Sequence, residues 1–443
     1  MLRRSAFFLI LAFAVPAFAD LANGRSLPIG DRSAFMANTG VADGRGSMAV
    51  LFNPGALGFV ERSKIALSGN LYFNQWTDFD PLVRYGGESQ SVRLSGFNSL
   101  PNSAVSIYKW GETTLAISVL VPDFSEIGTL QKIDLTNYKA VVQFNSKEQD
   151  LWIGATIARV WREKYGIGLS VYGTRYSQRS AVSVIGSVTS GGTATELTSI
   201  LNIEGAAHSI ETVLGAFVKP MPWLAAGLKI AAPGIRISGS GSYYASTRAT
   251  QGATQSIQTE DKPDIGYYYR RPAEFSLGFA VFARDDLRWY FDTNLQMPVT
   301  FEESPSASNP GLYDLRATLR LSTGVEYRLT PAWSFLSGGA FLPSAVPALE
   351  PRYAGRTRAT ECVGSAGIIY SDEHVRTGLG AFYFYADGDQ QVDATPGNIS
   401  HIRSTADVKL RILKETTRLH HERGGVDLQI ARDIEVERHW PEP

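Results

Sequence analysis

Histidines are the residues of this 443-residue chain best suited to acid–base or metal chemistry, and their spacing supports neither. None lies in a metal-binding pattern such as HExxH, and the adjacent His420 and His421 would point apart on a strand or a helix. The chain also lacks a GxSxG nucleophile motif and a phosphate-binding P-loop. We therefore expect no enzyme, no cofactor and no metal site, although a Ser/His pair could still meet in space without a motif. The histidines are His208, His374, His401, His420, His421 and His439.

Polar side chains alternate with large apolar ones in the stretch from 275 to 295. Arg288, Tyr290 and Asp292 lie two residues apart, so in a strand they share one face, and Trp289 and Phe291 lie on the other. Such a polar row suits the lumen of a barrel. Arg288, Tyr290 and Asp292 are therefore candidate lumen-facing residues.

The sequence Asn53-Pro54-Gly55 interrupts an apolar stretch that runs from 48 to 60. Pro54 fixes its own φ angle and lacks an N–H donor, and Gly55 allows backbone angles that other residues avoid. The Asn53 side chain can bond to the nearby backbone. A strand cannot pass through this point, so we expect a turn.

The elements that position these residues are expected to be strands, because large and small residues alternate in several stretches. Clear examples are 114–121, 165–172 and the hairpin of 275–295 with its turn at 284–286. Short polar turns alternate with long Ser/Thr/Gly-rich segments, and tryptophans lie at the expected strand ends. These features predict an all-β chain, a transmembrane antiparallel barrel of about 14 strands, while a secreted soluble β-protein stays open. The long segments are 186–202, 238–262 and 298–312.

The N-terminus and the composition predict export and exclude some partners. Residues 1–19 have a basic start, a short apolar run and an Ala-Phe-Ala cleavage pattern, as a secretory signal peptide does. Past it we find no apolar run of about 18 residues, which disfavours membrane-spanning helices. Lys and Arg (42) balance Asp and Glu (43), so no basic field would attract nucleic acid. The single cysteine, Cys362, cannot form an intramolecular disulfide, and we expect it to be buried.

Three motifs resemble the FadL-type outer-membrane transporters of long-chain fatty acids and aromatic hydrocarbons. They are GVADGRGSMAVLFNPGALGFVERSKIALSGNLYF, RPAEFSLGFAVFARDDLRWYFDTNLQ and STGVEYRLTPAWSFLSGGAFLPSAVP. The motifs occur in the order found in that family, and the resemblance runs from Ile29 to Asp387. This chain has Pro54-Gly55-Ala56 where the family usually has Pro-Ala-Gly.

The resemblance implies that residues 20–61 form a hatch inside the lumen, with Asn53, Pro54 and Gly55 as its exit turn. Residues 62–414 would form the barrel, and the charged residues 415–443 a tail outside the wall. Because this tail lacks sustained alternation, the identity of the closing strand is open.

The implied function is uptake of hydrophobic small molecules across the outer membrane of a Gram-negative bacterium. The expected partners are outer-membrane lipid, a hydrophobic ligand and the barrel assembly machinery, with the protein acting as a monomer. The alternative is a barrel that transports nothing and serves as an adhesin or a secretion-complex scaffold.

Overall fold

The computed structural model describes residues 28–304, 312–350, 357–391 and 399–417. The expected signal peptide, residues 20–27 of the expected hatch and residues 418–443 of the expected tail lie outside this part of the chain. Within it, no helix is long and apolar enough to cross a membrane.

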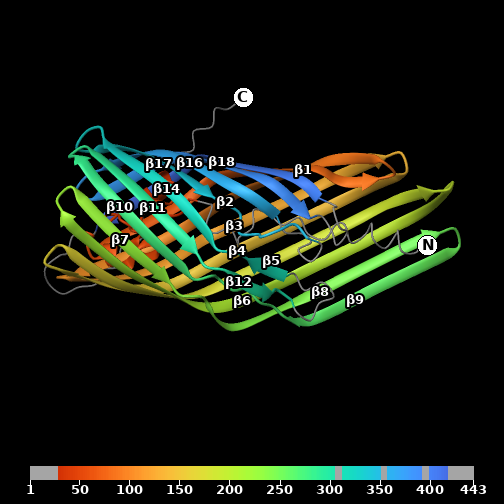
Figure 1. The fold of residues 1–443 in the computed structure, drawn as a ribbon, viewed down its shortest axis with the longest axis horizontal. Coiled ribbons are helices and arrows are strands. Elements are labelled where there is room, and N and C mark those ends of the chain that lie inside the picture. Colours follow the sequence, from red (N-terminus) through yellow and green to blue (C-terminus); the bar gives the residue numbers. More distant parts are fainter. Residues whose placement is uncertain (1–27, 305–311, 351–356, 392–398, 418–443) are drawn as a thin grey trace, which may run out of the picture.

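Long strands make up most of the described chain, and three one-turn helices precede them (Figure 1). The helices are α2 (Arg32–Phe35), α3 (Ala49–Phe52) and α4 (Pro54–Leu57). The strands are β1 (Lys64–Tyr85), β2 (Glu88–Trp110), β3 (Thr113–Leu135), β4 (Tyr138–Trp161), β5 (Tyr165–Ser190), β6 (Thr193–Met221), β7 (Leu224–Ala231), β8 (Ile235–Gln251), β9 (Thr254–Gly266), β10 (Glu274–Arg284), β11 (Leu287–Gln296), β12 (Val299–Glu302), β13 (Leu312–Leu315), β14 (Thr318–Arg328), β15 (Trp333–Leu342), β16 (Thr357–Ser371), β17 (Val375–Gln391) and β18 (Ile399–Thr417).

The described strands form a barrel that is closed at one end. Sixteen of them make one sheet, and all of these except β8 and β9 pair in a ring of fourteen through the contacts β1–β18, β5–β6, β6–β7 and β7–β10. All pairs of the ring are antiparallel, as the alternation predicts. The ring agrees with the expected barrel of about 14 strands. We call this end the hatch end, because residues 28–61, the described part of the expected hatch, lead into β1 there.

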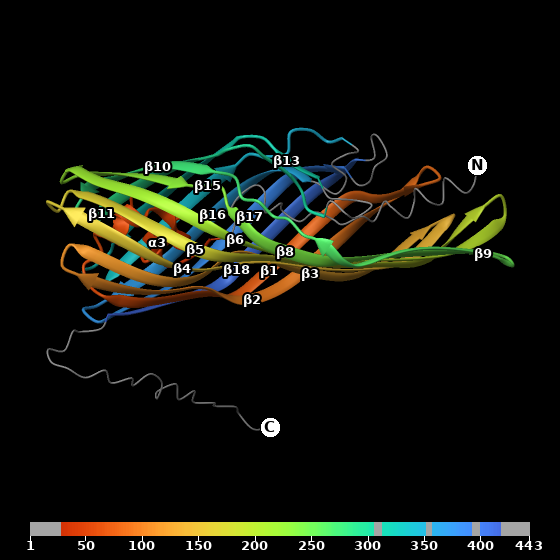
Figure 2. The ribbon, with the colours of Figure 1, turned by 90° about the horizontal axis from the view of Figure 1, so that it is seen from below.

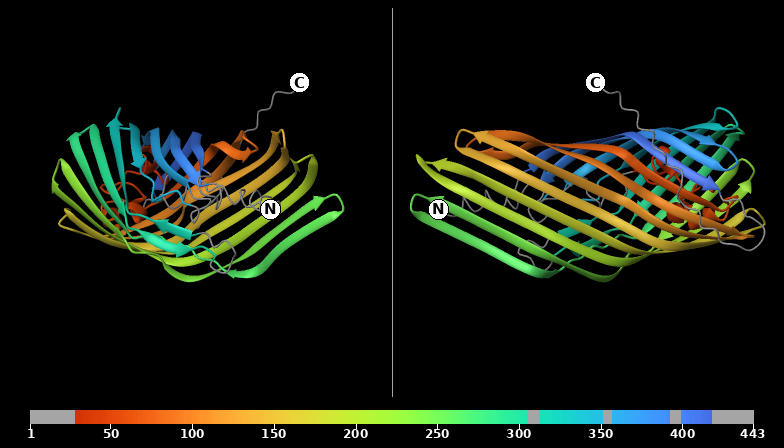
Figure 3. Two further views of the ribbon diagram at one scale, coloured as in Figure 1. Left: turned by 45° about the vertical axis from the view of Figure 1, so that its right-hand side comes forward. Right: turned by 180° about the vertical axis from the view of Figure 1, so that it is seen from behind.

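Toward the other end, the outer end, the wall is incomplete. Strands β7, β10, β11, β14 and β15 have only 8 to 11 residues, whereas β1 to β6 have 22 to 29. The long strands continue past the short ones as an open trough (Figure 3). The hairpin of β8 and β9 extends this trough by pairing with the outer half of β6. In the described chain, the far side of β9 pairs with no strand.

Two of the long segments that we expected as outer loops are strands. Residues 186–202 are the tip of the β5–β6 hairpin, and 238–262 lie mostly in β8 and β9. Residues 298–304 and 312–315 contribute the two-stranded ribbon of β12 and β13. The many Ser, Thr and Gly residues in these segments made the strands hard to predict, because they give little alternation between large apolar and small or polar side chains.

The closing strand also differs from the expected boundary. β18 runs to Thr417 and pairs with both β17 and β1, with Thr417 opposite Lys64. Residues 415–417 therefore belong to the wall and not to a tail. Strand pairing needs only backbone groups, so it tolerates the charged sequence that obscured this strand.

Inside the closed end, residues 28–61 fill the lumen (Figure 2). The largest buried apolar cluster joins hatch residues such as Leu51 and Leu57 to wall residues such as Trp152, Tyr172 and Phe217. Helices of four residues are not stable alone, so contact with the wall must stabilise these three.

Along the long strands, the face of the wall that carries the apolar side chains changes from the outward to the inward one. Near the hatch end of β4, Ile153 and Ile157 are half exposed on the outward face. Near its outer tip, the inward-facing Tyr138 and Phe144 are buried and the outward-facing Lys139 is exposed. The wall is thus apolar outside at the hatch end and apolar inside along the trough.

Cys362 is exposed, so the expectation that it is buried was wrong. β16 alternates, with Glu361 and Val363 facing inward, and places the Cys362 side chain on the outward face. The small, weakly polar thiol of Cys362 is compatible with the apolar outward face as well as with a buried position.

Candidate functional site

Asn53 connects three parts of the molecule through one fully buried side chain. Its Oδ1 accepts a hydrogen bond from the Gly55 N–H at 3.1 Å and thereby caps α4. Its Nδ2 donates to the Val41 carbonyl oxygen in the hatch at 2.7 Å and to the Ala216 carbonyl oxygen of β6 at 2.9 Å. The expected turn is therefore a one-turn helix that is tied to the hatch and to the wall.

Gly55 lies where the exit turn touches the wall. A Cβ at this position would lie 2.7 Å from the Gly215 carbonyl oxygen and 2.9 Å from the Gly166 carbonyl oxygen. Backbone atoms of β5 and β6 cannot move away without breaking their pairing, so alanine does not fit here. This contact explains the order Pro54-Gly55-Ala56 in this chain.

Asp292, on the inward face of β11, holds the hatch by its backbone. Its Oδ2 accepts hydrogen bonds from the Gly40 N–H at 2.7 Å and from the Val41 N–H at 2.9 Å. A Cβ at Gly278 of β10 would lie 2.6 Å from Val41 Cβ, so the small residue lets the hatch approach this closely.

Glu326 of β14 is the main ionic anchor of the hatch. It accepts two hydrogen bonds from the buried Arg32 guanidinium, at 3.0 and 2.8 Å, and Arg32 Nε also bonds Asp43 at 3.1 Å. Burial alone would lower the pKa of Arg32, but the charges of Glu326 and Asp43 outweigh it and hold this pKa well above its ordinary value. Arg32 thus remains charged in the lumen.

Arg45, a second hatch cation, extends this anchor. It bonds Glu326 and donates to the Tyr290 hydroxyl at 2.9 Å. Arg288 approaches Glu326 at 3.3 Å and is partly exposed. Of the polar row on β11, Tyr290 and Asp292 therefore bond hatch residues directly. Arg288 bonds Glu326, the carboxylate that also pairs with the hatch arginines Arg32 and Arg45.

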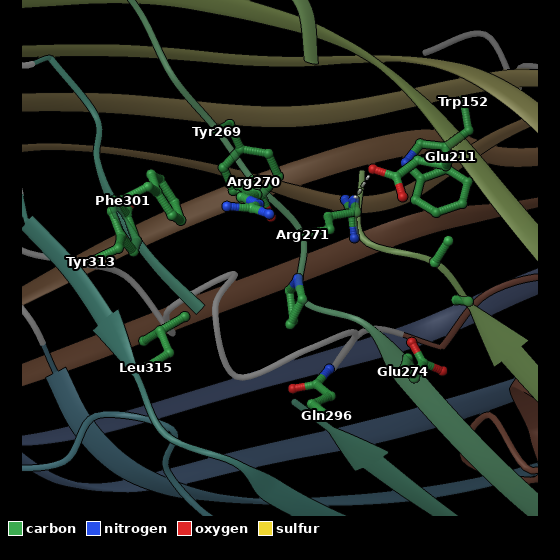
Figure 4. Close-up of a pocket in the computed structure, with 13 residues that line it drawn as sticks. Trp152, Glu211, Tyr269, Arg270, Arg271, Glu274, Gln296, Phe301, Tyr313 and Leu315 are labelled. Carbon is green, nitrogen blue, oxygen red and sulfur yellow. Dashed lines mark ion pairs between the residues drawn. The ribbon is translucent and has the colours of Figure 1, made fainter. Parts of the chain in front are cut away.

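A pocket lies on the inner face of the wall (Figure 4). It holds about 570 Å³ of space not filled by atoms, part of it open to solvent. Its residues come from β4, β6, β7, the segment 267–273, β10, β11, β12 and β13. They are Trp152, Glu211, Ala231, Ala232, Tyr269, Arg270, Arg271, Pro272, Glu274, Gln296, Phe301, Tyr313 and Leu315.

Stacked aromatic rings form one side of this pocket. The rings of Phe301 and Tyr313 stack with their centroids 4.5 Å apart, and Tyr269 meets Phe301 edge-on at 6.0 Å. Tyr269 also stacks on Tyr176 of β5 at 3.8 Å. Aromatic surfaces of this kind bind flat apolar molecules by stacking and by removing their surface from water.

Arg271 lies between Trp152 and Tyr269 in the pocket (Figure 4). Its guanidinium lies over the Trp152 ring at 4.7 Å and over the Tyr269 ring at 5.6 Å. It pairs with Asp150 and lies 3.9 Å from Glu211. Opposite charges thus already surround this cation.

The structure joins the hatch to the pocket through aromatic side chains. The Tyr172 hydroxyl donates to the Val50 carbonyl oxygen of the hatch at 2.5 Å, and the Tyr172 ring lies 5.1 Å from that of Trp152. A displacement of the hatch at Val50 would therefore shift Tyr172 and, through it, the pocket residue Trp152.

None of the pocket residues was predicted from the sequence to be functional. The run of three tyrosines and two arginines at 267–271 is the signal that was available, since such a run is unusual before a strand. The contacts of Phe301 and Tyr313 depend on how the 298–315 ribbon folds, which no local pattern shows. Among the described residues, no group of three or more His, Cys, Asp or Glu is placed to hold a metal ion.

Comparison with known proteins gives matches at the level of structure. No family model and no curated protein matches the chain. The P. putida toluene transporter TodX is 14% identical with a TM-score of 0.61, and the match covers 89% of this chain and 100% of that one. The Ralstonia pickettii toluene transporter TbuX is 16% identical with a TM-score of 0.57, covering 88% and 99%. A Pseudomonas aeruginosa FadL homologue is 13% identical with a TM-score of 0.58, covering 88% and 98%.

At identities this low, the matches show a shared fold and not a shared substrate. The matches span nearly the whole of each known structure, and the three sequence motifs lie mostly in the ring and in residues 28–61. The expected resemblance is confirmed, and this chain has the FadL-type fold.

Proposed function

We propose that the protein is an outer-membrane channel that takes up hydrophobic small molecules past a hatch. The observation that carries this proposal is the aromatic pocket, which lies inside the lumen next to a hatch that fills the closed end of the barrel. A concave site inside the wall that combines aromatic rings with a few charged and amide groups has the lining of a small-ligand site. The toluene transporters that share the fold support the same function.

The outward face supports a position in the membrane. On β10, the outward-facing Phe275, Leu277 and Phe279 are about 40% exposed, whereas the inward-facing Ser276 is buried. Water would not stabilise such a band of exposed apolar side chains, but lipid would. We infer that the ring spans the outer membrane and that the trough faces the outside of the cell.

The trough supports an entry route. Its inner face carries a second apolar cluster, which includes Phe79, Ile133, Tyr138 and Phe144. These side chains lie on the same face as the pocket, farther toward the outer end. These side chains are buried, so a hydrophobic molecule that enters from the outer end would have to displace part of this cluster before it reached Trp152 and Tyr269.

Aromatic hydrocarbons fit the pocket best. Arg271 already lies among carboxylates, and Lys229 pairs with Glu274, so neither cation needs a substrate charge. Arg270 lines the pocket and forms no ion pair with any residue that the structure describes. Long-chain fatty acids are the second candidate, because Arg270 could bind their carboxylate.

The test measures saturable uptake of toluene and of a long-chain fatty acid by proteoliposomes that contain the full-length protein. We expect Phe301→Ala with Tyr313→Ala to lower toluene uptake by about tenfold, because two stacked rings are lost. Phe341→Ala with Tyr383→Ala is the matched control, since both of these aromatic side chains are exposed on the outward face. Equal uptake by the two double variants would exclude the pocket from the transport path.

Arg270→Gln separates the two substrate classes. We expect it to leave toluene uptake unchanged. A selective loss of fatty-acid uptake would assign the fatty acid as the substrate instead. Failure of the wild type to take up either compound would favour an adhesin or a scaffold.

We further propose that residues 1–19 are removed on export, that the barrel assembly machinery inserts the chain and that it functions as a monomer. The signal-like N-terminus supports the first point. A ring that closes within one chain supports the last.

A further inference from the structure

The outward face of β4 and β5 changes from apolar to basic at one level of the wall. On β5, the outward positions run from Ile167 and Val171, which are half exposed, to Arg175 and Arg179. On β4, the corresponding change lies between Ile153 and Lys147. This level is the outer limit of the apolar band, where the headgroups of the outer leaflet would lie.

The three cations occupy adjacent strands. Lys147 is directly opposite Arg179 in the pairing of β4 with β5, and Arg175 is opposite His208 of β6. Arg175 and Arg179 are four residues apart on one strand, which places their Cα atoms about 13 Å from each other. We call Lys147, Arg175 and Arg179 the basic cluster.

The basic cluster borders a groove on the outward face that holds about 1030 Å³ of space open to solvent. Its far side consists of hydroxyl-bearing and small residues of β6 and β8, together with two carboxylates. The groove is lined by Lys147, Arg175, Ser177, Gln178, Arg179, Glu204, Gly205, Ala206, Ser240, Gly241, Ser242, Pro263 and Asp264.

Two of the three cations lack an internal partner. Lys147 pairs with Glu126 of β3 at 2.8 Å. Within the part of the chain that the structure describes, Arg175 and Arg179 form no ion pair and no side-chain hydrogen bond. Elsewhere on the trough, the exposed Arg93 pairs with Asp78 at 2.6 Å, whereas Arg84 and Arg248 likewise form no ion pair with a described residue.

We propose that the basic cluster and its groove bind the phosphorylated headgroup of an outer-leaflet glycolipid. A guanidinium forms paired hydrogen bonds with a phosphate, and the long arginine side chains can extend from the apolar band to the headgroup level. The hydroxyls of Ser177, Ser240 and Ser242 would contact the sugar. The bound lipid would hold the trough at the membrane surface, where hydrophobic molecules enter. This inference uses the membrane placement proposed above but not the transport activity.

The experiment titrates the detergent-solubilised full-length protein with bisphosphorylated lipid A and measures binding by native mass spectrometry. We expect Arg175→Gln with Arg179→Gln to weaken binding by about tenfold or more, because charge-assisted hydrogen bonds are lost. Arg93→Gln with Lys139→Gln removes the same charge elsewhere on the trough and should change the affinity by less than about twofold. Dephosphorylated lipid A should bind the wild type as weakly as bisphosphorylated lipid A binds the Arg175/Arg179 variant.

Several results would overturn the proposal. One is equal binding of the phosphorylated and dephosphorylated lipids, and another is an equal loss in the two double variants. Complete competition by millimolar inorganic phosphate would assign a site for free phosphate and not for a lipid. The gel shift on heating reports whether each variant is folded, and the single variants Arg175→Gln and Arg179→Gln replace the double variant if it is not. Toluene uptake, measured in parallel, separates this proposal from the proposed transport.

Discussion

At the scale of single residues, the hatch is held by side chains that act between segments far apart in the sequence. Asn53 bonds Ala216 of β6, and Arg32 bonds Glu326 of β14. The Asn-Pro sequence predicts a turn, because its chemistry is local. It does not predict these partners, since they depend on how the barrel closes around the hatch. Glu326 lies in one of the motifs that revealed the family resemblance, yet nothing in its local sequence indicates that it would pair with two hatch arginines.

Asn53→Ala tests the exit turn. The variant removes the cap of α4 and leaves the Val41 and Ala216 carbonyl groups buried without their donor, at a cost of about 1–3 kcal/mol for each unsatisfied group. We expect a modest rise in the conductance of single proteins in planar bilayers, because the hatch is held less firmly. Asn145→Ala, at an exposed position on the outward side of β4, should have no effect. Identical conductance of both variants and the wild type would show that Asn53 does not hold the hatch.

At the scale of elements, alternation predicts the strands where it contrasts large with small residues. The expected hairpin forms as β10 and β11, and the structure pairs Phe279 with Phe291. The β5–β6 tip and the β8–β9 hairpin were missed, because their Ser, Thr and Gly residues fit either face. β18 was missed at its end for a related reason, since charges interrupt the pattern while the backbone pairing continues to Thr417.

Leu277→Arg tests whether the apolar band contacts lipid. We expect a loss of about 2–4 kcal/mol in the stability of the barrel, because a charge near the middle of the bilayer is costly. Ile257→Arg is the matched control, since Ile257 is also an exposed apolar residue but lies on the β8–β9 hairpin of the trough. Urea unfolding in lipid vesicles gives both values. Similar losses for the two variants would contradict the assigned limit of the band.

Two truncations test the closing strand. A chain that ends at Thr417 keeps every described pair between β18 and β1, so we expect normal membrane insertion. A chain that ends at Asp407 loses the pairs from Leu410 to Thr417 and should fail to form a heat-modifiable barrel. Failure of the chain that ends at Thr417 to insert would place the closing strand beyond Thr417.

At the scale of the whole molecule, the proposed transport would use the ring, the hatch and the trough in different ways. The ring provides a lumen that is wide enough for water when it is empty, and the hatch fills it. The trough provides an apolar face outside the membrane band, and the aromatic pocket lies between trough and hatch. A ligand can shift the hatch only if it binds the open and closed arrangements with different affinity, and a few kcal/mol would suffice.

The most direct test of this account is a paired measurement of ionic conductance and saturable toluene uptake in the intact protein and in a variant that lacks residues 28–50. We predict low conductance with saturable uptake for the intact chain, and high conductance with loss of saturable uptake for the variant. A large current through the intact chain, together with no saturable uptake of toluene or of a fatty acid, would contradict the account and indicate a general porin.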